Sequence, residues 1–365
     1  MVRVRYDAQT FMRQRFGGIS RHFTSVVAEL DAAPDLGVEP VVDFTWTPNA
    51  YAVDQLTRHA LRSVPGWVPR AVPYGWNWLT ASVRHAPVDA VHHTYYSARF
   101  FAVPPQARRV VTVHDMIPER LAGTDGFTAG HLAKRRYVEA ADLVICVSDA
   151  TRRDLVELWG EPAAPTVVVP HALGPHFRPG QAPLPSLPGE YLLYAGARRG
   201  YKDFALLPDA LAALSRAGLA VPLVVAGPSL TRDESAAFTR RGLAPVPLVN
   251  PTDEVLARAM AGAIAVVQTS RYEGFGMTTL EAMGSGVPAV AADVGPMREV
   301  GGDVVRYFRR GDSEDLARVL ASVVSDDDLR EYVARQGVVR AAQFSGRRLA
   351  ERMAAAYRLV LGQSG

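Results

Sequence analysis

Short, unbroken apolar runs alternate with amphipathic segments along most of this 365-residue chain, and this alternation limits the possible folds more than any other feature. Continuous apolar runs are typical of parallel strands that are buried on both faces. We expect strands at 38–44, 88–92, 110–114, 143–147, 167–169, 191–195, 223–226, 263–269 and 289–291. Between them, apolar residues recur at helical spacing at 18–30, 151–159, 203–217, 253–260 and 313–324. Repeated β–α alternation predicts doubly wound α/β domains.

A stretch rich in proline and glycine, at 171–190, divides the chain into two halves. Because a residue before proline is disfavoured in a helix, we expect an extended connection here. At about 150 residues per domain, the length also indicates two domains. All nine histidines lie at or before His176, so imidazole chemistry must come from the first half or from the connection.

The composition excludes several classes of protein. Lys+Arg 40 against Asp+Glu 37 leaves a net charge of +3, which does not indicate nucleic-acid binding. The one cysteine, Cys146, forms no internal disulfide and no thiolate zinc site, which fits a reducing compartment. The first residues resemble a strand rather than a signal peptide, and no run of about 18 apolar residues occurs. We therefore expect a cytoplasmic protein; a peripheral contact with the inner membrane face stays open.

The segment 265–288 carries the strongest chemical signal. An apolar strand is followed by a glycine-containing loop with Glu273, and then by a helix with Glu281 in its second turn. Ligands of open α/β sheets bind at the carboxyl ends of strands, and helix N-termini favour phosphate. The two carboxylates suit a sugar ring and a ribose diol, although two solvated surface acids are the alternative. The backbone candidates for this site are Gly274, Phe275, Gly276, Met277 and Thr278.

Two further elements suit a diphosphate. Arg198, Arg199 and Lys202 follow the strand expected at 191–195. Guanidinium and ammonium groups at that edge neutralise phosphate, although a solvated basic loop has the same composition. We favour Arg198 and Lys202, with Arg199 left open. Gly17 and Gly18 open the first long helix and allow a close approach of backbone to phosphate, or form a plain tight turn.

Polar side chains also end two strands of the first half. His114 ends the strand at 110–114 and is followed by Asp115, which fits either a catalytic group or a satisfied polar turn. The residues at the end of the strand at 88–92 and just after it could line an acceptor site through stacking and hydrogen bonds. Alternatively, these residues form a surface turn whose aromatic side chains face the core. These acceptor-side candidates are His92, His93, Tyr95 and Tyr96.

Together these motifs resemble the family 4 retaining glycosyltransferases. Glu273 and Glu281, with the intervening EGFG, resemble that family's E-x7-E signature. Further similar elements are QRFGGISRHF at 14–23, TVHDMIP at 112–118, VSDATRRDL at 147–155, VPHALGPHF at 169–177 and YAGARRGYKD at 194–203. The GGISR and HDMIP elements look most like the mannosyl and polysaccharide-type members.

The resemblance implies the GT-B fold, in which two Rossmann-like domains face a central cleft. It predicts an N-terminal acceptor-side domain at 1–175, a hinge at 176–190, a nucleotide-sugar domain at 191–345 and a terminal segment at 346–365 whose helix, about 347–361, returns to the first domain. No cofactor and no obligatory metal are implied. We identify no DxD-type metal-binding motif in either half, because the run Asp326–Asp328 lies in a charged C-terminal region with a helical pattern. The two domains are expected to close over the donor, because the site needs groups from both halves.

The implied reaction moves a sugar from a nucleotide-diphosphate donor to a hydroxyl group with retention of the anomeric configuration. GDP-mannose is the preferred donor, and a UDP-sugar is the second choice. The catalytic residues would be His114, Glu273, Arg198 and Lys202. The acceptor could be a glycan, a lipid-linked sugar or a small molecule, and loops such as 246–252 carry no readable code for the base. A GT-B phosphorylase or epimerase and a non-catalytic sugar-nucleotide binder remain alternatives, whereas a dehydrogenase lacks its G-x-G-x-x-G motif here.

One segment departs from the α/β pattern. Residues 64–79 combine three tryptophans with three prolines. A loop that caps the first domain's core is one interpretation, and a surface for an acceptor or a lipid interface is the other.

Overall fold

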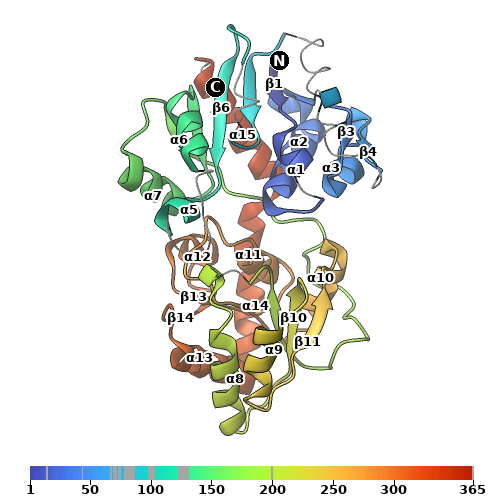
Figure 1. Cartoon of the computed structure of the whole chain (residues 1–365), viewed down its shortest axis with the longest axis vertical. Helices are drawn as coiled ribbons and strands as arrows, with labels where there is room; N and C mark the ends of the chain where they lie inside the picture. Colours follow the sequence, from blue (N-terminus) through green and yellow to red (C-terminus); the bar gives the residue numbers. More distant parts are fainter. Residues whose placement is uncertain are drawn as a thin grey trace. The chain divides into compact units, whose positions relative to one another are not determined.

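The computed structural model describes residues 1–13, 15–42, 44–65, 68, 72, 75–77, 87–97, 103–121, 131–198 and 200–363. The chain divides into two compact units, of which the first is Met1–Ala172 with Ser345–Gly365 and the second is Leu173–Phe344. Each unit contains a six-stranded sheet with helices packed on it (Figure 1). Residues 176–190, which we expected as a separate hinge, are grouped with the second unit. Most of the tryptophan-rich segment at 64–79 lies outside the described residues.

The first sheet has the order β2-β1-β5-β6-β7-β8, and every pairing in it is parallel. Its strands are β1 (Val2–Tyr6), β2 (Val38–Val42), β5 (Ala90–His93), β6 (Arg108–Val113), β7 (Leu143–Cys146) and β8 (Thr166–Val168). A separate small pair is formed by β3 (Trp46–Thr47) and β4 (Arg62–Ser63). The helices are α1 (Gln9–Arg13), α2 (Gly18–Ala32), α3 (Ala50–Gln55), α5 (Ile117–Arg120), α6 (His131–Glu139), α7 (Asp149–Trp159) and α15 (Gly346–Val360), with short 3-10 turns η1 (Pro34–Leu36) and η2 (Thr57–His59).

The second sheet repeats this plan with the order β11-β10-β9-β12-β13-β14, again parallel throughout. Its strands are β9 (Leu192–Ala195), β10 (Leu223–Gly227), β11 (Val246–Val249), β12 (Ala265–Gln268), β13 (Ala289–Ala292) and β14 (Arg306–Phe308). The helices are α8 (Leu206–Arg216), α9 (Arg232–Thr239), α10 (Asp253–Ala261), α11 (Met277–Gly284), α12 (Gly295–Gly301), α13 (Ser313–Ser325) and α14 (Asp327–Ala341), with 3-10 turns η4 (Gly200–Lys202) and η5 (Ala342–Phe344).

The strand order places a topological switch in the second sheet between β9 and β12. From β9 the chain continues outward through β10 and β11, and then returns to place β12 on the other side of β9. At such a switch the loops after the two strands diverge, and a crevice opens at the carboxyl edge of the sheet. The loops that follow β9 and β12 are those that carry Lys202 and Glu273.

The apolar runs predicted the central strands, whereas an edge strand departs from the prediction. Residues 246–249 were expected in a loop and form β11. This strand contains Pro247, and its residues are alternately half-buried and exposed. Proline is tolerated at a sheet edge, where an unpaired backbone position faces outward, so this strand lacks the continuous apolar signal of a central one.

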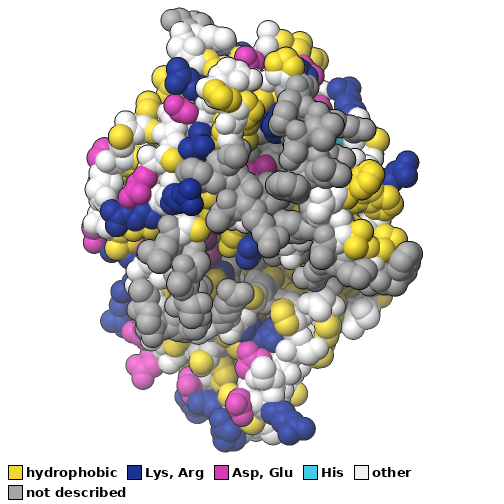
Figure 2. Space-filling model, turned by 45° about the horizontal axis from the view of Figure 1, so that its top comes forward, with side chains coloured by type: hydrophobic (Ala, Val, Ile, Leu, Met, Phe, Trp, Pro, Cys, Tyr) yellow, Lys and Arg dark blue, Asp and Glu magenta, His cyan; other side chains and the backbone are white. Residues whose placement is uncertain are grey.

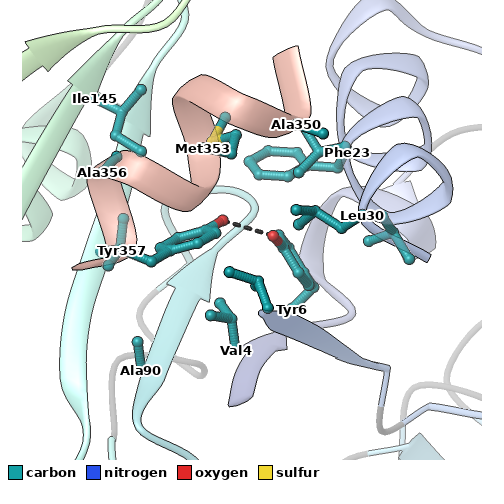
Figure 3. Packing of buried hydrophobic residues seen from close by; sticks show 14 of the residues in the cluster. Val4, Tyr6, Phe23, Leu30, Ala90, Ile145, Ala350, Met353, Ala356 and Tyr357 are labelled. Carbon is teal, nitrogen blue, oxygen red and sulfur yellow. Dashed lines mark hydrogen bonds between the residues drawn. The ribbon is translucent and has the colours of Figure 1, made fainter. Parts of the chain in front are cut away.

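The C-terminal helix belongs to the first unit, as expected. α15 packs against α2, and its Tyr357 meets Tyr6 of β1 in the core shown in Figure 3, where the two hydroxyl oxygens are 2.5 Å apart. Phe23 and Met353 are buried in the same cluster. At the surface, Arg347 pairs with Asp35 at 2.6 Å. Residues more than 300 positions apart therefore share one core.

Charged side chains of both signs lie near one another on the face drawn in Figure 2. Typical pairs at the surface are Arg241 with Asp209 and Arg298 with Asp293, each at 2.7 Å. This mixture agrees with the small net charge of +3.

Candidate functional site

The start of α11 requires glycine at its N-cap. Gly276 has φ 110°, a conformation that L side chains rarely adopt, and a Cβ there would lie 2.8 Å from Sδ of Met297. As the N-cap residue, Gly276 supplies no side-chain hydrogen bond to the backbone N–H groups of the first turn of α11. Uncapped N–H groups and the helix dipole favour an anion at this end. The glycine therefore keeps a helix N-terminus open at the carboxyl edge of β12.

Glu273 lies in the loop before this helix and pairs with Lys202. Its Oε1 is 2.5 Å from Nζ of Lys202, and the two side chains are 12% and 16% exposed. Backbone groups tie the two loops as well, because Oγ1 of Thr269 donates to the carbonyl of Lys202 at 2.6 Å. The backbone N–H of Arg271 donates to the carbonyl of Tyr201 at 2.8 Å. The structure thus brings together the predicted loop glutamate and the predicted lysine.

Glu281 lies on α11 and is only 2% exposed. The alternative that Glu273 and Glu281 are solvated surface acids is therefore wrong for both residues. A buried carboxylate needs hydrogen-bond partners. A glutamate buried within a helix therefore indicates a binding function or a polar network.

Arg198 is held at the end of β9 by three contacts. Its Nε donates to Glu234 at 2.9 Å, its Nη2 donates to the carbonyl of Ser229 at 2.7 Å, and the guanidinium lies over the ring of Phe204. Its Nη1 is buried and has no hydrogen-bond partner among the residues that the structure describes. Donors buried without a partner are rare and costly, so this nitrogen is available for an acceptor that the protein itself does not supply. Arg199 lies outside the described residues.

Glu234 is a residue that sequence reasoning missed. It completes a capping box at the start of α9, in which Thr231 and Glu234 bond to each other's backbone N–H groups. Burial opposes ionisation here, but the hydrogen bonds from Arg198 and from the backbone of Thr231 outweigh it and hold the pKa of Glu234 below its ordinary value. The Thr-x-x-Glu spacing predicts the helix start. It does not predict the pairing with Arg198, which depends on the neighbouring strand.

In the first unit, His114 lies in a cluster of imidazoles rather than alone. Its ring is 5.4 Å from that of His22 and stacks at 5.8 Å with that of His171. Nδ1 of His22 and Nδ1 of His171 are 2.7 Å apart, whereas neither ring nitrogen of His114 has a hydrogen-bond partner in the described part of the chain. Sequence reasoning missed His22, and the signal for it was the GGISRHF segment at 17–23, which contains it.

Burial keeps these imidazoles neutral. It lowers the pKa of His22 to about 3. Burial holds the pKa of His114 well below its ordinary value, and the nearby imidazoles and Lys134 further disfavour its protonated form. Burial also holds the pKa of His171 well below its ordinary value. A neutral imidazole both accepts and donates hydrogen bonds, which suits contact with hydroxyl groups.

Lys134 supports the turn that carries His114. Its buried Nζ donates to Glu119 at 2.9 Å and to the carbonyl of Asp115 at 2.8 Å. Both lysines of this arginine-rich chain, Lys134 and Lys202, therefore pair with a largely buried glutamate.

The expected acceptor-side residues lie mainly inside the fold. His92 is buried, with Nδ1 2.7 Å from the hydroxyl of Tyr357 and Nε2 2.8 Å from Oγ1 of Thr112. Both of its ring nitrogens are thus occupied, which leaves neither for an acceptor. His93 pairs through Nδ1 with Asp7 at 2.8 Å, and Tyr96 donates to the carbonyl of Thr112 at 2.8 Å.

Tyr95 is half-buried, and the guanidinium of Arg13 lies 4.1 Å from the centre of its ring. An acceptor contact by His93, Tyr95 or Tyr96 stays a prediction.

Gly17 and Gly18 do begin α2. Gly17 is the N-cap with φ 177°, an extended conformation open to any residue, and a Cβ at Gly18 would meet nothing within 4 Å. The backbone conformation therefore does not explain glycine here, and an approaching phosphate stays a prediction.

Neither a metal site nor a membrane-spanning helix is present in the described part of the chain. No group of three or more His, Cys, Asp or Glu side chains there has a geometry that could hold a metal ion. None of the helices in that part is long and apolar enough to cross a bilayer.

Family models match both units. Residues 16–175 match the model described as Glycosyltransferase Family 4, and residues 182–339 match the one described as Glycosyl transferases group 1. O-antigen chain mannosyltransferase B of Escherichia coli is 28% identical over 74% of this chain and 76% of its own length. D-inositol 3-phosphate glycosyltransferase 1 of Catenulispora acidiphila is 32% identical over 82% of this chain and 81% of its own length.

Among solved structures, Anabaena HepE, crystallised in complex with UDP-glucose, aligns with a TM-score of 0.71 and 19% identity over 97% of this chain and 98% of its own. At that identity the likeness concerns the fold, which is GT-B. The two family models, the relatives and the two parallel-sheet units agree, and the chain is therefore a glycosyltransferase of the group 1, family 4 type.

Proposed function

We propose that this glycosyltransferase moves a hexose from a nucleotide-diphosphate donor to a hydroxyl group of a glycan or other acceptor. We further propose retention at the anomeric carbon and no obligatory metal. The observation that carries the proposal is the Lys202–Glu273 pair beside the open N-terminus of α11, at the switch point of the second sheet. A cation, free backbone amides and a carboxylate at one strand edge suit a phosphate with a sugar attached to it.

Each residue has a proposed role. Lys202 and Nη1 of Arg198 hold the diphosphate, and the backbone from Gly274 to Thr278 holds the sugar-bearing phosphate. Glu281 binds the ribose diol and Glu273 binds hydroxyl groups of the donor sugar. In the first unit, neutral His114 contacts the donor sugar near the anomeric carbon, as the family resemblance implies. His93, Tyr95 and Tyr96 are proposed for the acceptor side, and His92 is not.

Catalysis in this proposal is mainly electrostatic. As the bond to the anomeric carbon breaks, negative charge grows on the leaving phosphate. Fixed cations and helix-end amides that stabilise this charge lower the barrier, and the loss of one such donor costs about 10²–10³ in rate at comparable sites. The leaving phosphate takes the proton of the acceptor hydroxyl while that oxygen attacks from the same face, which retains the configuration.

We propose GDP-mannose as the preferred donor and a UDP-sugar as the second choice. Support for mannose comes from the Escherichia coli relative, which is described as an O-antigen chain mannosyltransferase. Support for a UDP-sugar comes from HepE, which was crystallised with UDP-glucose. The former relative also supports a polysaccharide or lipid-linked acceptor.

A thermal-shift panel with GDP, UDP, ADP and dTDP tests the donor site. Ligand at about 100 times its dissociation constant adds roughly 2.7 kcal/mol, which corresponds to roughly a degree or more for a chain of this size. We expect one base to stabilise the wild type and Glu281→Ala to lose that shift. Glu254→Ala, at an exposed position of α10, is the matched control and keeps the shift. If no nucleotide shifts the wild type, the donor proposal is wrong.

The stereochemical claim needs a separate measurement. With the donor sugar of the base that binds, proton NMR of the first product reports the anomeric configuration. An inverted product would refute the same-face mechanism, although transfer itself would stand.

A further inference from the structure

The two cations proposed for the diphosphate both have a carboxylate partner in this structure. Lys202 pairs with Glu273 at 2.5 Å, and Arg198 pairs with Glu234 at 2.9 Å. All four side chains are at least four-fifths buried, because their exposures run from 5% to 20%. Largely buried pairs are only weakly screened by solvent, so an incoming phosphate must compete with these carboxylates.

The Lys202–Glu273 pair is not needed to hold its two loops together. Thr269 bonds to the carbonyl of Lys202, and the backbone of Arg271 bonds to the carbonyl of Tyr201. The guanidinium of Arg271 also pairs with Asp203 at 2.9 Å and donates to the carbonyl of Gly200 at 3.2 Å. With this frame in place, the ammonium and the carboxylate are able to change partners while the loops keep their positions.

We propose that Glu273 discriminates between a nucleoside diphosphate and a nucleotide sugar by competing with phosphate for Lys202. This inference rests on the proposed function. A nucleoside diphosphate takes Lys202 and leaves the Glu273 carboxylate without its cation. A nucleotide sugar takes Lys202 as well, but its hydroxyl groups then donate to the released carboxylate. The exchange therefore favours the sugar-bearing donor over the diphosphate that remains after transfer.

Glu234 provides an internal comparison, because its carboxylate also bonds to the backbone in addition to pairing with Arg198. Its Oε2 accepts the backbone N–H of Thr231 at 2.8 Å, so the carboxylate is committed to the capping box. While Arg198 is paired with Glu234, its Nη1 has no hydrogen-bond partner among the described residues. A phosphate can therefore bind Arg198 without displacing Glu234, and no exchange is expected there.

Calorimetric titration of the wild type and of Glu273→Gln tests the exchange, with GDP against GDP-mannose and UDP against UDP-glucose as probes. Because the amide that this substitution introduces carries no charge, we expect Glu273→Gln to bind the nucleoside diphosphate about three- to tenfold more tightly. We also expect the preference for the nucleotide sugar over the diphosphate to disappear. Glu234→Gln is the matched control and should keep the wild-type preference. Asp209→Asn, which removes a solvent-exposed partner of Arg241, should change neither affinity.

The outcomes separate this inference from the proposed function. If the wild type binds none of the probes, the proposed function fails. If the wild type binds but Glu273→Gln weakens diphosphate and nucleotide sugar by the same factor, Glu273 only positions Lys202 and the exchange is refuted. Glu273→Ala serves as a second variant, with thermal unfolding of each protein as the check on folding. If both variants fail to fold, the pair is part of the frame, which also refutes the exchange.

Discussion

Gly276→Ala should destabilise the second unit more than an ordinary glycine substitution does. A side chain at φ 110° is strained, which costs about 1–2 kcal/mol. The added Cβ would also lie 2.8 Å from Sδ of Met297. That sulfur is fully buried and accepts a hydrogen bond from Thr279, so it cannot move aside freely. Overpacking of this kind costs about 1–3 kcal/mol, so the total is about 2–5 kcal/mol.

Scanning calorimetry of wild type and variants measures this cost, with Gly242→Ala as the matched control. Gly242 has φ 70° and nothing within 4 Å of an added Cβ, so its substitution carries the backbone strain alone. We expect a clearly lower unfolding temperature for Gly276→Ala than for Gly242→Ala. The double variant Gly276→Ala/Met297→Ala should show a smaller loss than the two single losses added together, because the clash is gone. Equal losses in Gly276→Ala and Gly242→Ala would refute the steric argument.

Two further predictions concern the first unit. Tyr357→Phe removes the hydrogen-bond partner of both the Tyr6 hydroxyl and Nδ1 of His92, so it should lower the free energy of unfolding in urea by about 1–3 kcal/mol. The control Tyr332→Phe, at an exposed position, should change it by almost nothing. Equal effects of the two substitutions would show that the buried network contributes little to stability. Burial lowers the pKa of His22 to about 3 in the folded chain, whereas its ordinary value is 6.5. As the pH falls below 6.5, the unfolded chain therefore binds a proton at His22 and the folded chain does not, so the folded state loses stability. The unfolding temperature should therefore fall between about pH 7 and about pH 5, and by less in His22→Phe than in the exposed His176→Asn; parallel pH profiles would contradict a neutral, buried His22.

The central strands could be predicted from the sequence because burial on both faces demands unbroken apolar runs. The runs at 143–147 and 191–195 form β7 and β9, and each strand is one residue shorter than predicted at one of its ends. The edge strand β11 could not be predicted in this way. It is half-exposed and contains Pro247, and its strand conformation depends on pairing with β10.

The candidate site was predictable where one local segment carries its chemistry. The loop and helix from Glu273 to Glu281 are continuous in sequence, and the glycine at 276 is required by a local conformation. The partners of these residues were not predictable. Glu273 and Lys202 are separated by 71 positions, and Arg198 and Glu234 by 36, so only the pairing of neighbouring strands brings them together.

The sequence by itself determined the α/β class, the resemblance to a glycosyltransferase family and the strand–loop–helix segment, because each depends on residue type and short spacing. The tertiary structure decided that His114 lies against His22 and His171, that His92 is bonded within the core, and that Lys202 has a carboxylate partner. Burial and charge neutralisation belong to the packed arrangement of distant segments. The same imidazole or ammonium has a different protonation and a different availability once its neighbours are in place.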